Sequence, residues 1–527
     1  MHRSVLLLVA LAACAPATST TPTTTDPVTA VAANELRRDL FVFAADSFLG
    51  RETGTAASNK AARFVAERAM SLGLEPAGDS LYYQRVPLVR NVLGPGTQFS
   101  VSTATGVMPL ALGPDLVPIT NLGIGAPLPR RNVEGDLFFA GYGMTTDGRS
   151  DFEGIDGPGK VIVMVHDAPA TVTDSAARAR LTGQDEISQR ILRALQLQPA
   201  AIILLMHGPT AEFYSLATPD LLRSVSTAPG DRTTSDAQRP LPMVLLGLAK
   251  EGTPLLPADW KTNDAPRPVA GRRFTGRVEL RVEPFTAYNV VAVVRGTDPR
   301  FNKTYVAFGS HFDHIGIVHG NPADTIANGA DDDGSGTVTM LALARVLKAS
   351  PPKRSTLFVW HVGEEKGLLG SAHFTNNATV PIDSIVAHVN MDMIGRRGGV
   401  SAKFNSATQG ATAANKLFVL GPNAAPNNQS KLLGAILDTV NARQSPPMSL
   451  DYAFDTPNHP ERYYYRSDHF NYAQKGIPIL FFSTGFHEDY HKVSDEPDKI
   501  DYDKMARIGN LLADLGRTLG NREARPR

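Results

Sequence analysis

Histidines and acidic residues gather in five short segments of the second half of the sequence. These segments are Ser310–His314, Gly329–Gly336, Gly363–Gly367, Met391–Met393 and Tyr490–His491. Imidazole nitrogens and carboxylate oxygens bind zinc, and a carboxylate beside a bound metal can act as a general base. The only cysteine, Cys14, lies in the N-terminal leader, so no thiolate is available to a metal site in the remaining chain. The residue types therefore favour a hydrolytic zinc centre over a structural zinc finger.

The first two segments each have a metal-binding interpretation and a structural one. In His311-Phe312-Asp313 the imidazole can bind a metal while the carboxylate orients the ring, although most histidines in such tripeptides serve structure or lie at the surface. Three consecutive acids, Asp331 to Asp333, precede an apolar helix in a Gly-rich loop. One acid would satisfy the dipole of the helix N-terminus, whereas three in a tight loop repel one another unless a cation neutralises them.

The remaining segments add a base and further ligands. In Glu364-Glu365 one glutamate can bind a metal while its neighbour acts as base, although a solvated charged turn is the commoner explanation for such a pair. Asp392 lies between two methionines in a segment that we expect to be buried, where an unpaired carboxylate is costly. Tyr490 and His491 follow an apolar run near the C-terminal end. No single segment decides between the two interpretations.

Apolar runs precede most of these segments and predict the strands that position them. The expected strands are Val290–Val294, Tyr305–Gly309, Thr356–Val362, Ser384–Asn390 and Ile479–Phe482, and the helices between them include Thr337–Lys348 and Gly367–Asn376. This alternation indicates an α/β fold with a mostly parallel central sheet flanked by helices. In such sheets ligands gather at the carboxyl ends of the strands, so we expect four of the segments to meet there.

The order and spacing of the five segments resemble those of the co-catalytic zinc aminopeptidase family, which includes glutamate carboxypeptidase and glutaminyl cyclase. The matching stretches are Ser310–His314, Gly329–Gly336, Gly363–Ser371, Asn390–Arg396 and Tyr490–Asp495. Ala45–Thr55 and Ser467–Phe470 also resemble flanking segments of that family. The resemblance implies two zinc ions per chain that activate a water molecule for attack on a peptide bond.

The resemblance also implies a role for each site residue. It places His311 and Asp392 on one zinc, Glu365 and His491 on the other, Asp332 between both, Asp313 behind His311, Glu364 as general base and Tyr490 as donor to the oxyanion. At position 333 relatives often carry asparagine where this chain has aspartate. Asp331, Asp332 and Asp333 therefore all remain candidates for the bridging ligand.

The chain is too long for a single hydrophobic core. Gly135–Val165 and Pro199–Leu205 resemble the protease-associated domain that is inserted in many members of the family. We therefore expect a peptidase domain made of residues 34–131 and 276–527, interrupted by an inserted β-rich protease-associated domain at 132–275.

The N-terminal leader indicates export and membrane anchoring. Arg3 and the apolar run Val5–Leu11 are typical of a signal peptide, and the run is too short to span a bilayer. Leu-Ala-Ala-Cys at 11–14 resembles the lipobox of bacterial lipoproteins, in which the cysteine is lipidated after cleavage, although an ordinary secretory leader is the alternative. We expect a signal peptide at 1–13, a tether at 14–33 and, because Ala15 follows the cysteine, a lipoprotein at the outer membrane or in the periplasm of a bacterium.

Together these patterns predict an exopeptidase that removes residues from the N-termini of peptides. A carboxypeptidase or dipeptidase of the same fold, a glutaminyl-cyclase-like acyltransferase and an inactive cell-surface binding protein remain as alternatives. Lysine and arginine number 52 against 52 aspartate and glutamate, so net charge gives no reason to expect a nucleic-acid partner. The expected partners are peptide substrates and the membrane.

Overall fold

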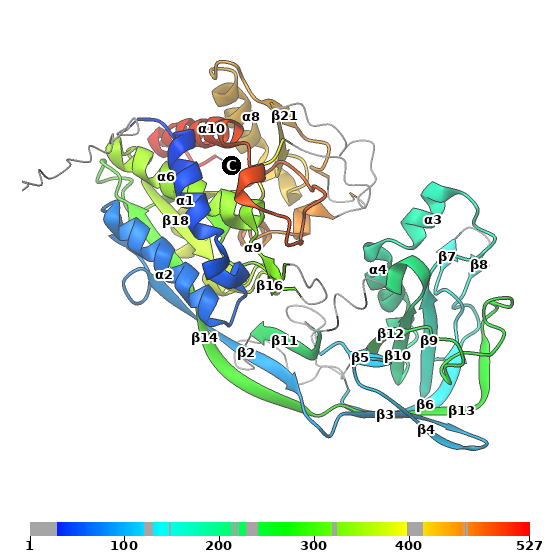
Figure 1. The fold of residues 1–527 in the computed structure, drawn as a ribbon. Coiled ribbons are helices and arrows are strands. Elements are labelled where there is room, and N and C mark those ends of the chain that lie inside the picture. Colours follow the sequence, from blue (N-terminus) through cyan, green and yellow to red (C-terminus); the bar gives the residue numbers. More distant parts are fainter. Residues whose placement is uncertain are drawn as a thin grey trace, which may run out of the picture.

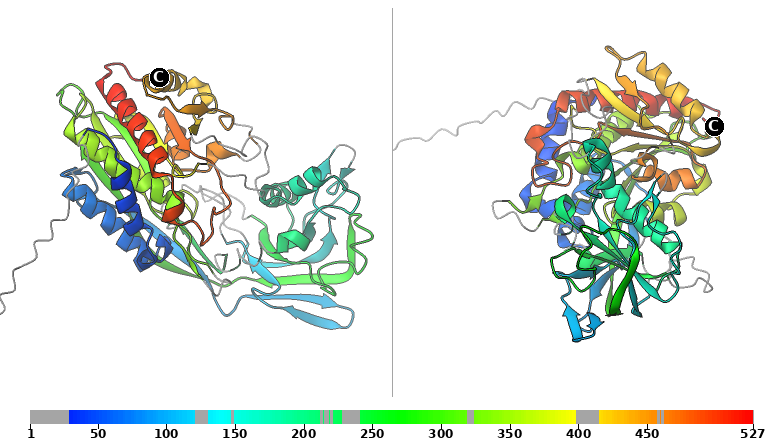
Figure 2. Two further views of the ribbon diagram at one scale, coloured as in Figure 1. Left: turned by 45° about the horizontal axis from the view of Figure 1, so that its top comes forward. Right: turned by 90° about the vertical axis from the view of Figure 1, so that its right-hand side faces the viewer.

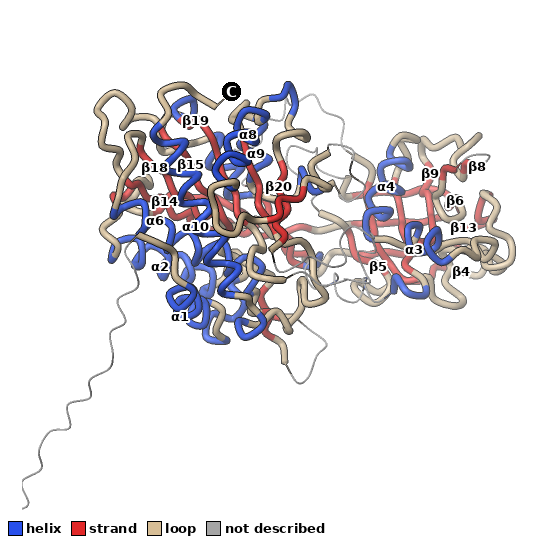
Figure 3. The backbone as a smooth tube through the Cα atoms, turned by 90° about the horizontal axis from the view of Figure 1, so that it is seen from above, coloured by secondary structure: helices blue, strands red, loops and turns tan. Residues whose placement is uncertain are grey.

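The computed structural model describes residues 29–526, except for 121–129, 147–148, 212–213, 215–217, 219–220, 228–240, 319–323, 398–414, 457–458 and 460–461. Two β-sheets dominate it, and they lie side by side when the molecule is seen from above (Figure 3). Helices cover the larger sheet, whereas the smaller sheet forms a separate unit joined to the larger one by long strands (Figure 1). The expected signal peptide, Cys14 and most of the tether lie outside the described residues.

The larger sheet has ten strands with a parallel centre. Its order is β11 (Arg223–Thr227), β2 (Tyr83–Leu93), β14 (Leu280–Val294), β18 (Ser355–His361), β15 (Tyr305–His311), β19 (Ile385–Met391), β22 (Ile479–Ser483), β20 (Lys416–Leu420) and β21 (Ser449–Asp451), and β1 (Glu75–Pro76) pairs with β14. The neighbours β18, β15, β19 and β22 are parallel, while β14 and β20 join them in the antiparallel sense. The predicted α/β class is confirmed, and antiparallel strands extend the sheet on both sides.

Both faces are buried at the centre of the larger sheet, where successive residues of the strands point to opposite cores. In β14, Val290 and Ala292 belong to one core and Val291 and Val293 to the other. The first core packs under α1 (Ala33–Phe43), α2 (Ala56–Ser71), α6 (Gly336–Ala349), α8 (Lys431–Asn441) and α10 (Tyr502–Asn521). The second packs under α7 (Leu369–Asn376) and α9 (His469–Gln474). Helices therefore pack against both faces of the sheet whose strand ends carry the segments rich in histidine and acid.

The smaller sheet has eight strands. Its order is β4 (Gly106–Leu110), β3 (Gln98–Thr103), β13 (Arg267–Arg277), β6 (Asn132–Phe139), β9 (Lys160–His166), β10 (Ala201–Met206), β12 (Met243–Leu248) and β5 (Leu116–Pro118). Ile162 and Met164 of β9 pack with α4 (Gln184–Leu195), which follows the short helix α3 (Ser175–Leu181). Residues 98–118, which we assigned to the peptidase domain, belong to this sheet instead, so the unit begins well before residue 132.

Two long strands connect the units. β2 and β14 pair along their length, from Tyr83 with Val290 to Leu93 with Leu280, and lead from the larger sheet to the smaller one (Figure 2). Two short pairs complete the strands: β7 (Thr145–Thr146) with β8 (Arg149–Ser150), and β16 (Gly316–Ile317) with β17 (Ile326–Ala327). Among the described residues, none of the helices combines the length and the apolar character needed to cross a membrane.

Candidate metal centre

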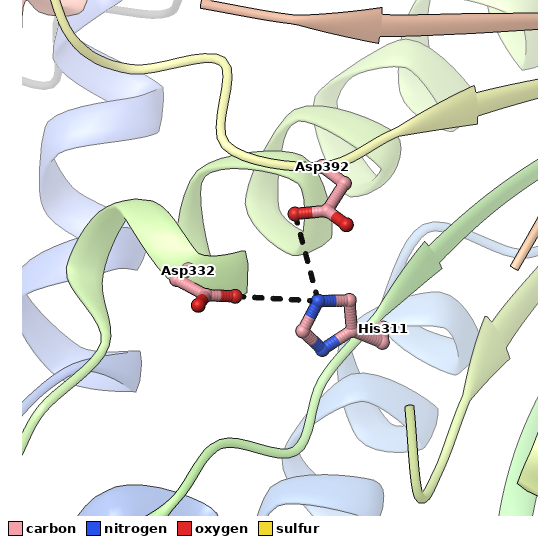
Figure 4. Close-up of side chains that lie close together, drawn as sticks. All are labelled: His311, Asp332 and Asp392. Carbon is pink, nitrogen blue, oxygen red and sulfur yellow. Dashed lines mark ion pairs between the residues drawn. The ribbon is translucent and has the colours of Figure 1, made fainter. Parts of the chain in front are cut away.

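The segments rich in histidine and acid meet at the carboxyl ends of the parallel strands, where α/β sheets bind ligands. Their residues come from separate elements: His311 ends β15, Glu364 and Glu365 follow β18, Asp392 follows β19, Asp332 lies in η4 (Ala330–Ser335) before α6, and His491 lies beyond β22. Three of these residues, drawn in Figure 4, point toward one another from different parts of the chain. The predicted convergence is therefore present in the structure.

His311, Asp332 and Asp392 form a first group of possible metal ligands. The Nε2 atom of His311 lies 3.4 Å from Asp332 Oδ1 and 3.7 Å from Asp392 Oδ1. Ligand atoms on a tetrahedral zinc with bonds of about 2.0–2.1 Å stand roughly 3.3 Å apart. Nε2 of His311 is buried and finds no hydrogen-bond partner among the described residues. The spacing and the chemistry of this group therefore fit a zinc ion.

Asp332, Glu365 and two histidines form a second group. His491 Nε2 lies 3.2 Å from Asp332 Oδ2 and 3.0 Å from Glu365 Oε2. His314 Nδ1 lies 2.7 Å from Glu365 Oε1 and 3.8 Å from Asp332 Oδ2. Our sequence interpretation missed His314, although it ends the same segment as His311. A second histidine so close to a strand end was the available signal.

The structure distinguishes the three consecutive acids. Asp332 presents one carboxylate oxygen to each group. Asp331 accepts the main-chain N–H of Gly395 at 2.6 Å, and its other oxygen lies 3.2 Å from His487 Nε2. Asp333 accepts main-chain N–H groups with both of its oxygens. Asp332 is therefore the one acid of the three that belongs to both groups.

Asp313 contacts His311 through a different atom from the one expected. The Nδ1 atom of His311 lies 3.1 Å from the main-chain oxygen of Asp313 and 3.7 Å from its carboxylate. The carboxylate instead accepts the Thr53 hydroxyl at 2.8 Å and the main-chain N–H of Glu364 at 3.2 Å. The main-chain carbonyl of Asp313 thus orients the imidazole of His311. The carboxylate of Asp313 links the end of β15 to the loop that carries Glu364 through a hydrogen bond. The carboxylate also lies within ion-pair distance of the imidazole, at 3.7 Å, so the prediction that Asp313 orients His311 stands, with the carbonyl as the nearer contact.

The carboxylates and imidazoles of the two groups strongly shift one another's pKa values. Burial, reinforced by the charge of Asp392, raises the pKa of Glu364 well above its usual value. Burial would also raise the pKa of Glu365, but His491 and His314 hold it at about 2. Burial lowers the pKa of His491, yet Glu365 and Asp332 raise it to about 10. A positive charge is therefore favoured between these acids, and a zinc ion can supply it in place of the imidazolium proton.

An apolar cleft adjoins both groups. Its walls include Met393, Leu420, Phe454, Tyr463, Phe481 and Phe486, and it opens to solvent. Tyr490 and Arg466 also line it. The Tyr490 ring stacks on His491 with centroids 3.9 Å apart, and burial raises the pKa of its hydroxyl well above the usual value. Tyr490 therefore keeps its proton and can donate a hydrogen bond into the cleft.

A buried arginine from the N-terminal part of the chain holds two of the segments together. Arg51 ends η1 (Asp46–Arg51) and is fully buried. Its guanidinium donates to the main-chain oxygens of Phe312 at 2.8 Å, Asn328 at 2.5 Å and Gly329 at 2.8 Å. The sequence does not indicate this role, because main-chain carbonyl groups that accept hydrogen bonds from an arginine leave no pattern of charge pairs.

The grouped histidines and carboxylates at the strand ends define a candidate metal centre in an α/β fold. The chain matches the profile of Peptidase family M28 over residues 289–516. Its fold is similar to that of the aminopeptidase from Aneurinibacillus sp. strain AM-1, with a TM-score of 0.54, 18% identity and coverage of 93% of this chain and 94% of that one. A zinc aminopeptidase from Bacillus subtilis is similar, with a TM-score of 0.52, 19% identity and coverage of 94% and 98%.

Curated relatives match a smaller part of the chain. A "probable zinc metalloprotease" of Pyrenophora teres f. teres is 27% identical over 271 residues, which cover 46% of this chain and 54% of the relative. A "probable leucine aminopeptidase 2" of Aspergillus oryzae is 30% identical over 212 residues, covering 40% and 36%. The chain thus spans about half or less of the length of these two relatives.

Proposed function

We propose that this chain is a zinc aminopeptidase that removes residues from the N-termini of peptides. The observation that carries the proposal is the position of Asp332 between two groups of ligand atoms, with the Glu364 carboxylate 3.9 Å from His311 Nε2. The match of residues 289–516 to Peptidase family M28 and relatives named as aminopeptidases support it. His311, Asp332 and Asp392 would hold one zinc ion, and Asp332, Glu365 and His491 the second.

The side chains around the cleft supply the proton transfers. Bound zinc would contribute Lewis acidity, which makes water a stronger nucleophile and polarises the scissile carbonyl. Glu364 would accept a proton from the attacking water and return it to the leaving amine. The Tyr490 hydroxyl would donate a hydrogen bond to the substrate oxygen that becomes negative in the transition state. The raised pKa of Glu364 supports its role, because a base that must also act as an acid needs a pKa nearer to neutrality. The raised pKa of the Tyr490 hydroxyl supports its role for a different reason, since a hydroxyl that keeps its proton can donate a hydrogen bond.

The polarity of cleavage gives the first prediction. Glu364 and Asp392 line the cleft beside the ligand groups, and their negative charge favours the free ammonium group of a peptide N-terminus. Aminoacyl-nitroanilide substrates should therefore be hydrolysed, and acetylation of the substrate amine should abolish hydrolysis. Amidation of a peptide C-terminus should have little effect. Comparing initial rates on free, acetylated and amidated versions of one peptide measures all three expectations.

One residue favours the opposite polarity and provides its test. Arg396 is paired with Asp489 and Asp495, and Arg397 with Asp501. Arg466 lines the cleft, with its guanidinium 4.7 Å from the centroid of the Phe486 ring, where it could bind a substrate carboxylate. A carboxypeptidase or dipeptidase would cut acetylated peptides, reject amidated ones and lose its preference in Arg466→Met. That combination would overturn the aminopeptidase proposal.

We further propose that the protein is exported and lipid-anchored at Cys14. The proposal rests on the sequence Leu-Ala-Ala-Cys at 11–14 and on the tether composition behind it. Cys14→Ser should prevent lipidation and leave the leader uncut by the lipoprotein signal peptidase. The wild-type protein should then be processed and partition into the detergent phase. The variant should carry no lipid, which mass spectrometry of the N-terminal peptide measures. Identical lipid content and partitioning in both proteins would contradict the proposal.

We also propose that the smaller sheet is the protease-associated domain. Its resemblance at Gly135–Val165 and Pro199–Leu205 supports this, and those ranges overlap β6, β9 and β10 of the smaller sheet. The domain would then extend from Gln98 to Arg277, since β3 and β13 pair within the same sheet.

A further inference from the structure

His314 occupies a confined position beside the second group of ligand atoms. Its side chain is fully buried, and its ring lies edge-to-face against His491 with centroids 5.6 Å apart. On another side, Gly329 approaches so closely that a Cβ atom at this position would lie 2.5 Å from Cγ and Cδ2 of the ring. Gly329 has a φ of +55°, and its carbonyl accepts a hydrogen bond from buried Arg51 at 2.8 Å. The imidazole of His314 therefore has little freedom to turn.

The distances around Glu365 separate a hydrogen bond from a metal contact. His314 Nδ1 lies 2.7 Å from Glu365 Oε1, the length of a charge-assisted N–H···O hydrogen bond. Two atoms bound to one tetrahedral zinc with bonds of about 2.0–2.1 Å would stand roughly 3.3 Å apart. The other carboxylate oxygen, Oε2, lies 3.0 Å from His491 Nε2, which is nearer to that separation. Because a carboxylate only accepts hydrogen bonds, Nδ1 of His314 must carry the hydrogen.

We propose that His314 is a positioning residue that donates its Nδ1–H to Glu365 Oε1 and thereby presents Oε2 to the zinc site shared with His491 and Asp332. The inference rests on the proposed zinc centre and adds to it a determinant of zinc affinity. Without the donor, Glu365 could rotate about its terminal torsion, and the buried oxygen Oε1 would lose its partner. Removing partners that orient metal ligands typically lowers metal affinity about 10–100-fold.

Three substitutions separate this role from general packing and from direct zinc binding. In His314→Asn the side-chain amide nitrogen can take the place of Nδ1 and keep the hydrogen bond. In His314→Gln the amide is carried farther from the backbone, near the place of Nε2, and His314→Leu has no donor. The measurements are zinc competition titrations with a chromophoric chelator, which give the stoichiometry and affinity of each ion, and the melting temperature of the metal-free proteins.

His314→Gln and His314→Leu should lower the affinity for one of the two zinc ions about 10–100-fold, while His314→Asn should bind both ions about as tightly as wild type. The metal-free melting temperature measures what each substitution costs the fold itself, both in packing and in the lost hydrogen bond, so it separates that cost from the change in zinc affinity. Gln and Leu variants that bind zinc as tightly as wild type would overturn the inference. So would an Asn variant as weak as Leu, because the imidazole would then bind zinc itself. If Leu fails to fold, the contrast between Asn and Gln still decides the outcome.

The wild-type titration separates this inference from the proposed function. A wild-type protein that binds no zinc would overturn the proposed function and this inference with it. A wild type that binds zinc, together with variants that are all indistinguishable from it, would overturn the inference alone.

Discussion

Glu364→Gln should lower turnover about 10²–10⁴-fold, the usual contribution of a general base, while the zinc content stays unchanged. The reason is position: the Glu364 carboxylate lies beside the cleft and 3.9 Å from His311 Nε2, outside both groups of ligand atoms. Glutamine keeps the size and the hydrogen-bonding capacity of the side chain but cannot accept a proton at neutral pH. Steady-state kinetics and elemental analysis of the same preparation check the two halves of this expectation.

The neighbouring residue provides the matched control. Glu365→Gln is the same substitution one position later, and Glu365 lies between His314 and His491. This variant should lose zinc, and part of its activity should return when zinc is added in excess. If Glu364→Gln loses zinc while Glu365→Gln keeps it, the assignment of base and ligand within the pair is reversed.

Asp332→Ala should lower both zinc occupancy and activity more than the loss of any other single ligand. Its two oxygens face His311 and His491 at 3.4 and 3.2 Å, so one substitution removes a ligand from each group. The metal contribution to transition-state stabilisation is several kcal/mol, which corresponds to a loss of about 10³-fold or more in turnover. Zinc content and kcat of the purified variant measure the effect.

The adjacent acid tests whether this loss is specific. Asp333 accepts main-chain N–H groups with both oxygens, and an amide oxygen can replace one of these acceptors. Asp333→Asn should therefore keep most of its zinc, at some cost in stability. An Asp332→Ala variant with normal zinc content, or an Asp333→Asn variant that loses both ions, would refute Asp332 as the shared ligand.

The sequence predicted the elements that carry a continuous apolar run. β15 and β18 are buried on both faces and were found within one or two residues of their ends. The site residues could be predicted because they follow these strands in motifs of a known family. Asp332 could not be chosen among its neighbours, since all three acids share one loop and only their tertiary partners distinguish them.

Other features depend on contacts far apart in the sequence. Arg51 and Thr53 contact site residues that lie more than 250 positions later in the sequence. Neither residue type by itself predicts such a contact. The boundary of the smaller sheet was misplaced because β3 pairs with β13, a strand from the other end of the unit. The sequence of β3 contains no local pattern that indicates to which of the two sheets the strand belongs. Such pairings are decided by the packing of two distant segments, which a local pattern does not record.

Zinc titration of the metal-free protein tests the central claim most directly. Removal of metal with a chelator should abolish hydrolysis of an aminoacyl-nitroanilide, and added zinc should restore it as the protein binds about two equivalents per chain. The expectation follows from the two groups of ligand atoms that share Asp332. Full activity in a preparation that elemental analysis finds free of transition metals would contradict the account.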